Sequence, residues 1–111
     1  NEGVEKAIES TKPGNTCHDV AVAFWNILEK YGLEKESRCG YSIGLGYPPD
    51  WGEHTLSIRK NEKTVLYPNV TYHLMAGMWM DTWGLEISES IRVTENGCEL
   101  FCNFPRDLHL V

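Results

Sequence analysis

The sequence has 111 residues, enough for one domain with a single hydrophobic core. Hydrophobic residues make up 41% of the chain and four residues are tryptophan, a composition that excludes an intrinsically disordered protein. Sixteen acidic and ten basic residues give a net charge of −6, with no run of Lys or Arg. Nucleic acid and anionic membrane surfaces are therefore not expected partners.

The location of the protein is predicted from what the chain lacks. No apolar run is long enough to span a membrane and no export signal precedes the first helical pattern, so we expect a cytoplasmic protein. The cysteines have no paired CxxC spacing, which favours reduced thiols over a zinc site, although counting alone leaves two disulfides open. Because the first ten residues read like the interior of a helix, we expect the chain to be part of a longer protein.

Two helices are predicted at the start of the chain. Val4–Ser10 can form about two turns, and Thr11–Gly14 interrupts them because proline lacks a backbone donor and glycine favours a turn. Asn15 or Thr16 can then cap a second helix over Cys17–Tyr31, where apolar residues recur at the spacing of one buried face.

Strands are predicted in the second half of the chain. Thr55–Arg59 and Leu85–Glu95 alternate apolar and polar residues, whereas Val70–Met80 is almost continuously apolar and is expected to be a buried central strand. Asn96-Gly97 is a strong hairpin signal, and Cys98–Phe101 follows it as the last strand. Two helices followed by mostly antiparallel strands predict an α+β fold.

The stretch Gly40–Glu53, GYSIGLGYPPDWGE, does not read as an ordinary helix or strand. Pro48 and Pro49 stiffen the segment around them, and the glycines permit close backbone approach. A rigid, aromatic, glycine-flanked segment is a plausible wall for a small polar ligand, so we interpret it as a ligand-site loop.

The pattern of motifs resembles the pita-bread superfamily, which includes methionine aminopeptidase, prolidase, aminopeptidase P and creatinase. The resemblance runs from the helix-KPG-helix unit (Ala7–Tyr31) through GYSIG (Gly40–Gly44) to VTENGCELF (Val93–Phe101). It implies that residues 1–111 are the C-terminal half of a pita-bread catalytic domain, with the upstream part of that domain and an N-terminal domain absent. It also implies a homodimer.

The same resemblance implies that the metal ligands of the peptidases are replaced. It places Tyr41 at the metal-binding His, Met75 at one metal-binding Glu and Ser88 at another, while two upstream Asp residues have no counterpart. Phenol, thioether and hydroxyl groups are poor ligands for hard divalent ions, so we expect no metal and no other cofactor. If the register differs, Glu86 or Glu89 is the surviving ligand, and strand alternation favours Glu86 because it shares a face with Ser88.

Within the superfamily, GYSIGLGYPPDWGE together with HLMAG and WGLEISES resembles the ectoine hydrolase branch. That resemblance implies metal-independent hydrolysis of a C–N bond in a small cyclic amidine, most simply ectoine. Glu86 is then the candidate catalytic residue, with Glu53 as an alternative, and the principal catalytic carboxylate lies outside this chain, which should be inactive alone. The candidate substrate-binding residues are Tyr41, Tyr47, Trp51, Glu53, Met75 and Ser88. The alternatives are a metal-dependent Xaa-Pro peptidase and a non-catalytic binding domain.

Overall fold

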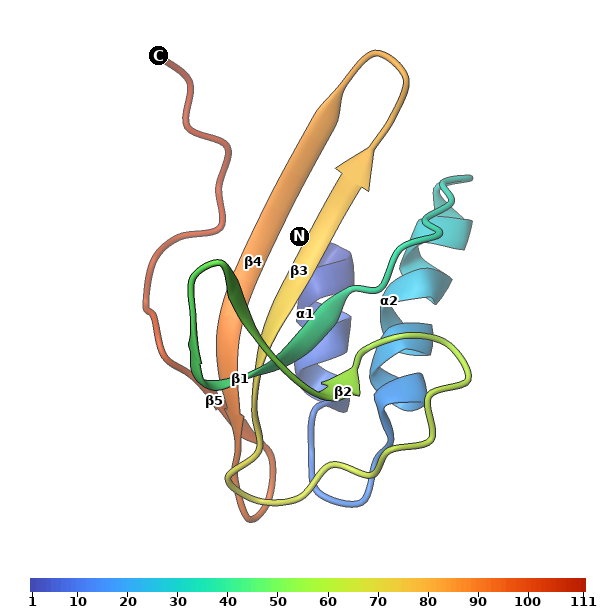
Figure 1. Ribbon diagram of the computed structural model, residues 1–111. Helices are drawn as coiled ribbons and strands as arrows, with labels where there is room; N and C mark the ends of the chain where they lie inside the picture. The colour runs from blue at the N-terminus through green and yellow to red at the C-terminus, as the bar shows by residue number, and fades with distance from the viewer.

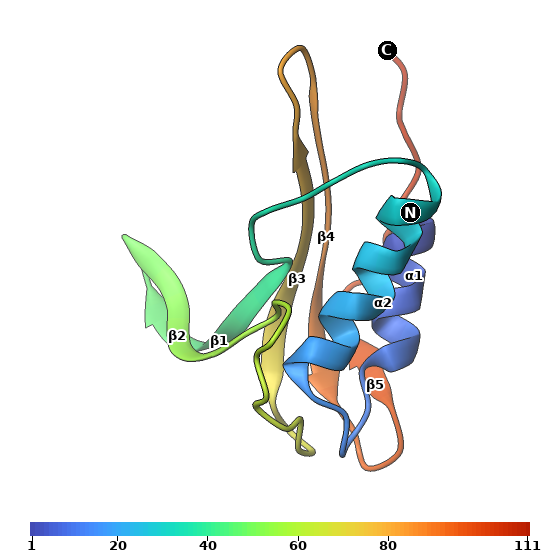
Figure 2. The same cartoon turned by 90° about the vertical axis from the view of Figure 1, so that its right-hand side faces the viewer.

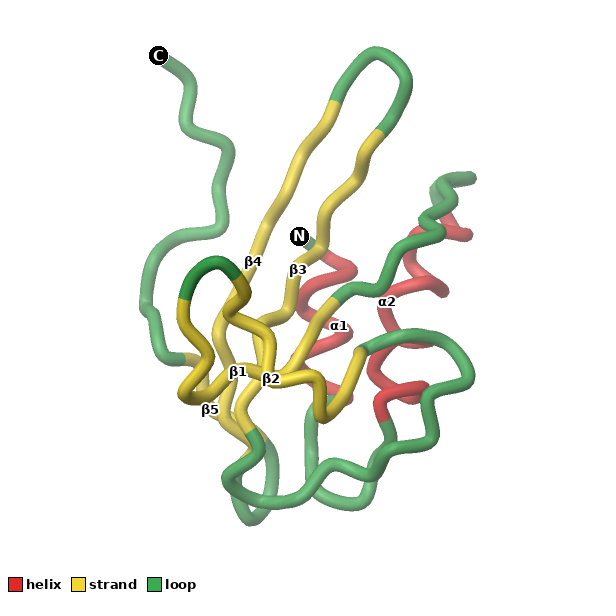
Figure 3. Tube along the Cα trace, viewed as in Figure 1, coloured by secondary structure: helices red, strands yellow, loops and turns green.

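The computed structural model describes all 111 residues and contains two helices followed by one five-stranded sheet (Figure 1, Figure 3). The sheet order is β2-β1-β3-β4-β5, and every pairing is antiparallel. The predicted α+β class is confirmed. The elements are α1 (Glu2–Ser10), α2 (Cys17–Lys30), β1 (Gly40–Tyr47), β2 (Asp50–Ser57), β3 (Thr71–Trp79), β4 (Gly84–Val93) and β5 (Cys98–Leu100).

The second helix begins where its capping residues predict. The Thr16 hydroxyl accepts a hydrogen bond from the Asp19 backbone N–H, and the Asp19 carboxylate accepts one from the Thr16 backbone N–H, which together form a capping box. Of the two predicted caps, Thr16 is therefore the one used. Asn15 instead donates from its side chain to the Ser10 carbonyl, which ties the interhelical turn to the end of α1.

Both helices cover the same face of the sheet (Figure 2). Along β3 the residues that face the helices are almost fully buried, and they continue the apolar surface of α1 and α2. Because side chains alternate along a strand, the residues between them lie on the opposite face, which is called the open face below. The helix-facing residues of β3 are Tyr72, Leu74, Ala76 and Met78. The expectation that this strand is central and buried is confirmed.

The stretch Gly40–Glu53 belongs to a β-hairpin, so the expectation of a loop was wrong, while its role as a wall for a ligand stays a prediction. Only Pro48 and Pro49, joined by a cis peptide bond, lie between β1 and β2. The glycines serve close backbone approach: a Cβ on Gly40 would lie 2.9 Å from the His73 carbonyl oxygen of the neighbouring strand. The hairpin projects from the side of the sheet away from the helices (Figure 2).

The last residues after β5 form no helix or strand and run beside β4 (Figure 3). Arg106 fixes this tail by donating from Nη1 to the Glu89 carboxylate at 2.7 Å and from Nε to the Asn1 side chain at 3.0 Å. All four cysteines are free thiols, and no helix is long and apolar enough to cross a membrane.

Candidate functional site

The centre of the open face is a row of side chains that crosses three strands. Tyr41 on β1 is paired with His73 on β3, which in turn is paired with Ser90 on β4. Directly opposed residues of antiparallel strands project to the same face, so these three side chains are neighbours. The Tyr41 and His73 rings have centroids 5.5 Å apart and are tilted by 52°, and His73 Nδ1 lies 3.3 Å from the Ser90 hydroxyl.

Two further rows continue this face toward the β3–β4 hairpin. Met75 is paired with Ser88, and Gly77 is paired with Glu86. Successive rows on one face are about 7 Å apart, because each is two residues further along a strand. The four residues that the motif resemblance aligns with metal ligands, or places beside them, therefore share one face: Tyr41, Met75, Glu86 and Ser88.

The ambiguity between Glu86 and Glu89 is settled by their orientation. Glu89 is 6% exposed, lies on the helix-facing side of β4 and is bound to Arg106. Glu86 is exposed on the open face, where its charge acts on both His73 and Lys35. Of these two carboxylates, Glu86 is therefore the one that a ligand on the open face can meet. Glu99 lies on the same face but is already paired with Arg92.

Burial controls the ionisation of His73. The ring is half-buried, and loss of solvent lowers its pKa, while the Glu86 carboxylate partly opposes that shift. The imidazole is consequently neutral near pH 7 and can accept a proton there.

Two cations border this face, and the sequence pattern did not single out either of them. The Arg38 guanidinium lies 5.1 Å from the centre of the Tyr41 ring and donates to the Ser57 hydroxyl at 3.0 Å. It forms no ion pair with a carboxylate. Lys35 donates to the Gly77 carbonyl and to the Ser37 hydroxyl, and burial lowers its pKa. Neither residue could be predicted from the sequence, because its position depends on how the segment between α2 and β1 crosses the sheet.

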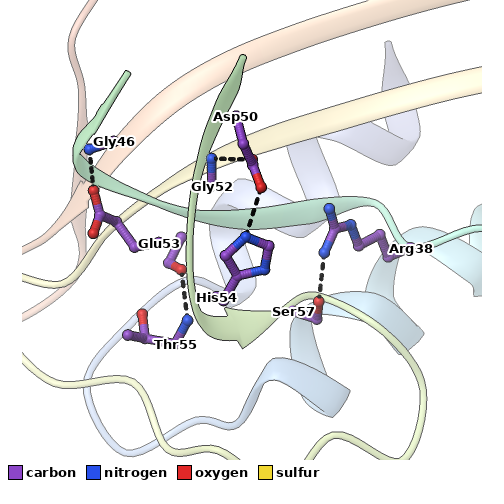
Figure 4. Close-up of polar contacts among 9 residues, drawn as sticks. Arg38, Gly46, Asp50, Gly52, Glu53, His54, Thr55 and Ser57 are labelled. Carbon is purple, nitrogen blue, oxygen red and sulfur yellow. Dashed lines mark hydrogen bonds and ion pairs between the residues drawn. The ribbon is translucent and has the colours of Figure 1, made fainter. Parts of the chain in front are cut away.

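The acidic residues of the β1–β2 hairpin, Asp50 and Glu53, make separate sets of hydrogen bonds (Figure 4). The Glu53 carboxylate accepts a hydrogen bond from the Gly46 backbone N–H, and so stabilises the hairpin itself. Asp50 binds the Gly52 backbone N–H at 2.9 Å and the His54 ring at 2.6 Å.

The aromatic residues of the hairpin lie near its end. Tyr47 is 83% exposed and Trp51 is 57% exposed, so neither packs against the Tyr41 row within this chain. The structure thus brings Tyr41, Met75, Ser88 and Glu86 onto one face and leaves the predicted residues Tyr47, Trp51 and Glu53 outside that group.

The side chains of the open face do not suit a pair of divalent metal ions. No three His, Cys, Asp or Glu side chains gather closely enough to hold a metal ion. The residues at the expected ligand positions are a phenol, a thioether and a hydroxyl, whereas two hard cations need several ionised oxygen ligands. The face instead combines the Glu86 carboxylate and the His73 imidazole with the Arg92–Glu99 ion pair, and two further cations border it. This combination fits an organic ligand that carries both charges.

Comparison with known proteins shows which family and which proteins this chain is similar to. Residues 1–95 match metallopeptidase family M24. The chain is 51% identical over 108 residues to the ectoine hydrolase of Halomonas elongata, covering 96% of this chain and 27% of that protein. The chain thus spans about 27% of the length of this curated relative.

Solved structures share the fold. The dipeptidase PepE from Mycobacterium ulcerans superposes with a TM-score of 0.87 at 26% identity, covering 96% of this chain and 28% of that one. The prolidase from Pyrococcus horikoshii gives a TM-score of 0.86 at 26% identity, with 97% and 30% coverage. Prolidases were among the enzymes to which the motifs pointed, so the predicted pita-bread fold is confirmed.

Proposed function

The chain belongs to metallopeptidase family M24, and from that premise we propose that it forms the substrate-facing sheet of a metal-independent hydrolase. The proposed reaction opens the ring of a small cyclic amidine, with ectoine as the substrate. The observation that carries this proposal is that Tyr41, Met75 and Ser88, which the motif resemblance aligns with metal ligands of the peptidases, lie together on the open face. The 51% identity to an ectoine hydrolase supports the choice of substrate.

The charges of the substrate match those of the open face. A cyclic amidine carboxylate such as ectoine carries a delocalised cation and an anion within a few ångströms of each other. Glu86 can pair with the amidinium, and the ring of Tyr41 offers a polarisable surface beside it. Arg38, which donates to the Ser57 hydroxyl and whose charge also acts on Asp50, can pair with the substrate carboxylate.

Hydrolysis of an amidinium consumes one water and gives an amide and an ammonium group, so the net charge does not change. The water oxygen bonds to the amidine carbon and loses a proton to a base, after which the C–N bond breaks and the leaving nitrogen gains a proton. Glu86 binds and orients the amidinium for this attack through its opposite charge. The principal catalytic carboxylate is proposed to lie outside these 111 residues, so that the isolated chain is inactive.

The proposal is tested on the full-length protein that carries this chain. We expect turnover of ectoine to an N-acetylated diaminobutyrate that survives exhaustive chelation, and metal analysis that finds no stoichiometric manganese, cobalt or zinc. Glu86→Gln should raise the KM for ectoine at least tenfold, because an amidinium then loses its ionic partner. Glu95→Gln, an exposed carboxylate beyond the end of β4, is the matched control and should leave KM unchanged.

The second candidate is a metal-dependent Xaa-Pro dipeptidase, which the superposition on a prolidase favours. It predicts hydrolysis of Xaa-Pro dipeptides that stops on chelation and returns with added manganese or cobalt. That result, without ectoine turnover, would refute the metal-independent mechanism. If the protein hydrolyses neither compound, a non-catalytic domain, the third alternative, is favoured.

Homodimer formation and a cytoplasmic location stay predictions.

A further inference from the structure

His73 is the one histidine at the centre of the open face, between Tyr41 and Ser90. Its Nδ1 atom lies 3.3 Å from the Ser90 hydroxyl, while its Nε2 atom has no hydrogen-bond partner in the chain. Every fully buried polar side-chain atom of the chain does have a partner. The Nε2 atom therefore reaches solvent, and it does so on the face where the proposed substrate binds.

The ring is held in place from two sides. Tyr41 contacts it from β1, and Ser90 contacts it from β4, so its orientation is defined before any ligand arrives. A proton-transfer group needs this fixed orientation together with one free ring nitrogen.

Charged groups lie around the ring, and none of them forms an ion pair with it. Glu86 acts on it from β4, and Arg92, one row away on the same strand, is already bound to Glu99 and Asn69. On the β1 side, Arg38 lies against Tyr41. No carboxylate bonds to the imidazole, in contrast to the exposed His54, which Asp50 holds at 2.6 Å.

We propose that His73 is the proton-transfer residue of the hydrolysis, with Nε2 as the reacting atom and Ser90 as its positioning residue. This inference rests on the proposed function and adds to it a residue outside the positions that the metal ligands occupy in the peptidases. It also explains how a site without a metal-activated water can activate water.

The protons can be balanced with His73 as the transferring group, while the carboxylate proposed outside these 111 residues orients the attacking water. Nε2 takes a proton from water as the C–O bond forms at the amidine carbon, which leaves a neutral tetrahedral intermediate and an imidazolium. The imidazolium returns the proton to the ring nitrogen as the C–N bond breaks. The hydroxyl proton of the intermediate then passes to the released amine, which gives the amide and the ammonium group, and His73 is neutral again.

The test uses the full-length protein and His73→Gln, which keeps a polar side chain of similar length. We expect kcat for ectoine to fall 10²- to 10⁴-fold, the usual range for loss of a general acid–base group, while the calorimetric Kd changes less than threefold. His54→Gln, which alters the exposed hairpin histidine, is the matched control and should retain kcat.

Two readouts separate proton transfer from a structural role. The acidic limb of the wild-type kcat–pH profile should disappear in His73→Gln, and added imidazole should restore part of the activity of His73→Ala. A melting temperature within a few degrees of the wild type excludes a folding defect. Retained kcat in His73→Gln would overturn the proposal, as would an unchanged pH profile.

Failure of the proposed function has a different signature. If the wild type cleaves an Xaa-Pro dipeptide and not ectoine, the choice of substrate is wrong, and the same His73 variants then test proton transfer on that substrate. If the wild type hydrolyses neither compound, both proposals are refuted.

Discussion

The ion pair between Glu89 and Arg106 gives the most direct test of how the sheet is held against its tail. Glu89 is on the helix-facing side of β4 with its side chain 5% exposed, and Arg106, in the segment after β5, donates to it at 2.7 Å. Arg106 also donates to the Asn1 side chain and lies 3.9 Å from the Glu5 carboxylate. One guanidinium therefore connects the tail, α1 and the central sheet.

Replacing Arg106 with Ala should destabilise the protein because it leaves the Glu89 carboxylate buried without a counter-charge. Breaking a fully buried pair costs about 3–5 kcal/mol, and the partial exposure of Arg106 places the expected loss at the lower end, about 3 kcal/mol. Adding Glu89→Gln removes the uncompensated charge. The double variant should therefore be more stable than Arg106→Ala alone by about 1–2 kcal/mol.

The free energy of unfolding is measured by urea denaturation of the two single variants, the double variant and Arg92→Ala. The last is the matched control, because Arg92 and Glu99 form an exposed pair at the same 2.7 Å distance. It should lose far less stability than Arg106→Ala, since water screens an exposed pair. Equal losses in Arg92→Ala and Arg106→Ala, or no recovery in the double variant, would show that Glu89 is not effectively buried.

Two further predictions concern the helix cap and the thiols. Thr16→Ala should destabilise the protein by about 1 kcal/mol through loss of the α2 cap. Hydrogen bonds from Thr16 lower the pKa of Asp19, so the stability that this carboxylate adds is complete above its ordinary pKa of 3.8 and is lost as the pH falls through its lower folded pKa. Urea melts of Asp19→Asn should therefore show a smaller loss of stability between pH 5 and pH 2 than urea melts of the wild type. Burial raises the pKa of Cys17 to about 11 and of Cys39 to about 12. A thiol reagent at pH 8, followed by mass spectrometry, should therefore label the exposed Cys102 first and leave Cys17 and Cys39 unlabelled until the protein unfolds. Rapid labelling of Cys39 would contradict its burial.

Local chemistry explains which parts of the fold the sequence predicts well. The Thr16 cap, the apolar face of α2 and the continuous apolar run of β3 are signals carried by neighbouring residues, and each element begins or ends within two residues of its predicted position. The predicted strand Thr55–Arg59 overlaps the end of β2, but β1 and the first half of β2 were interpreted as a loop because these strands are irregular. Three extra residues of β2 lie between the pairs Tyr41–Ser57 and Ile43–Gly52, so no period-2 pattern marks the segment.

The predictability of the candidate site follows the same division. Alternation along β4 alone separates Glu86 from Glu89, and the structure agrees. The positions of Arg38 and Lys35 depend on how the segment between α2 and β1 crosses the sheet, which no local pattern encodes. His73 is predictable only in part. The face of β3 on which it lies follows from alternation, but its contact with Tyr41 depends on the pairing of β1 with β3.

The balance of charge on the open face provides the last argument for an organic ligand. Two divalent cations bring four positive charges, and a site for them must supply several carboxylates close together. On this face Glu99 is paired with Arg92, so Glu86 is the carboxylate without an ion-pair partner. Lys35 is close enough to act on its charge, and Arg38, whose charge also acts on Asp50, lies further along the sheet. These side chains alone supply too few ionised oxygen ligands for a pair of dications, whereas a ligand with one cationic and one anionic end can meet an opposite charge at each end. The same sheet positions therefore favour a small zwitterion over a metal pair.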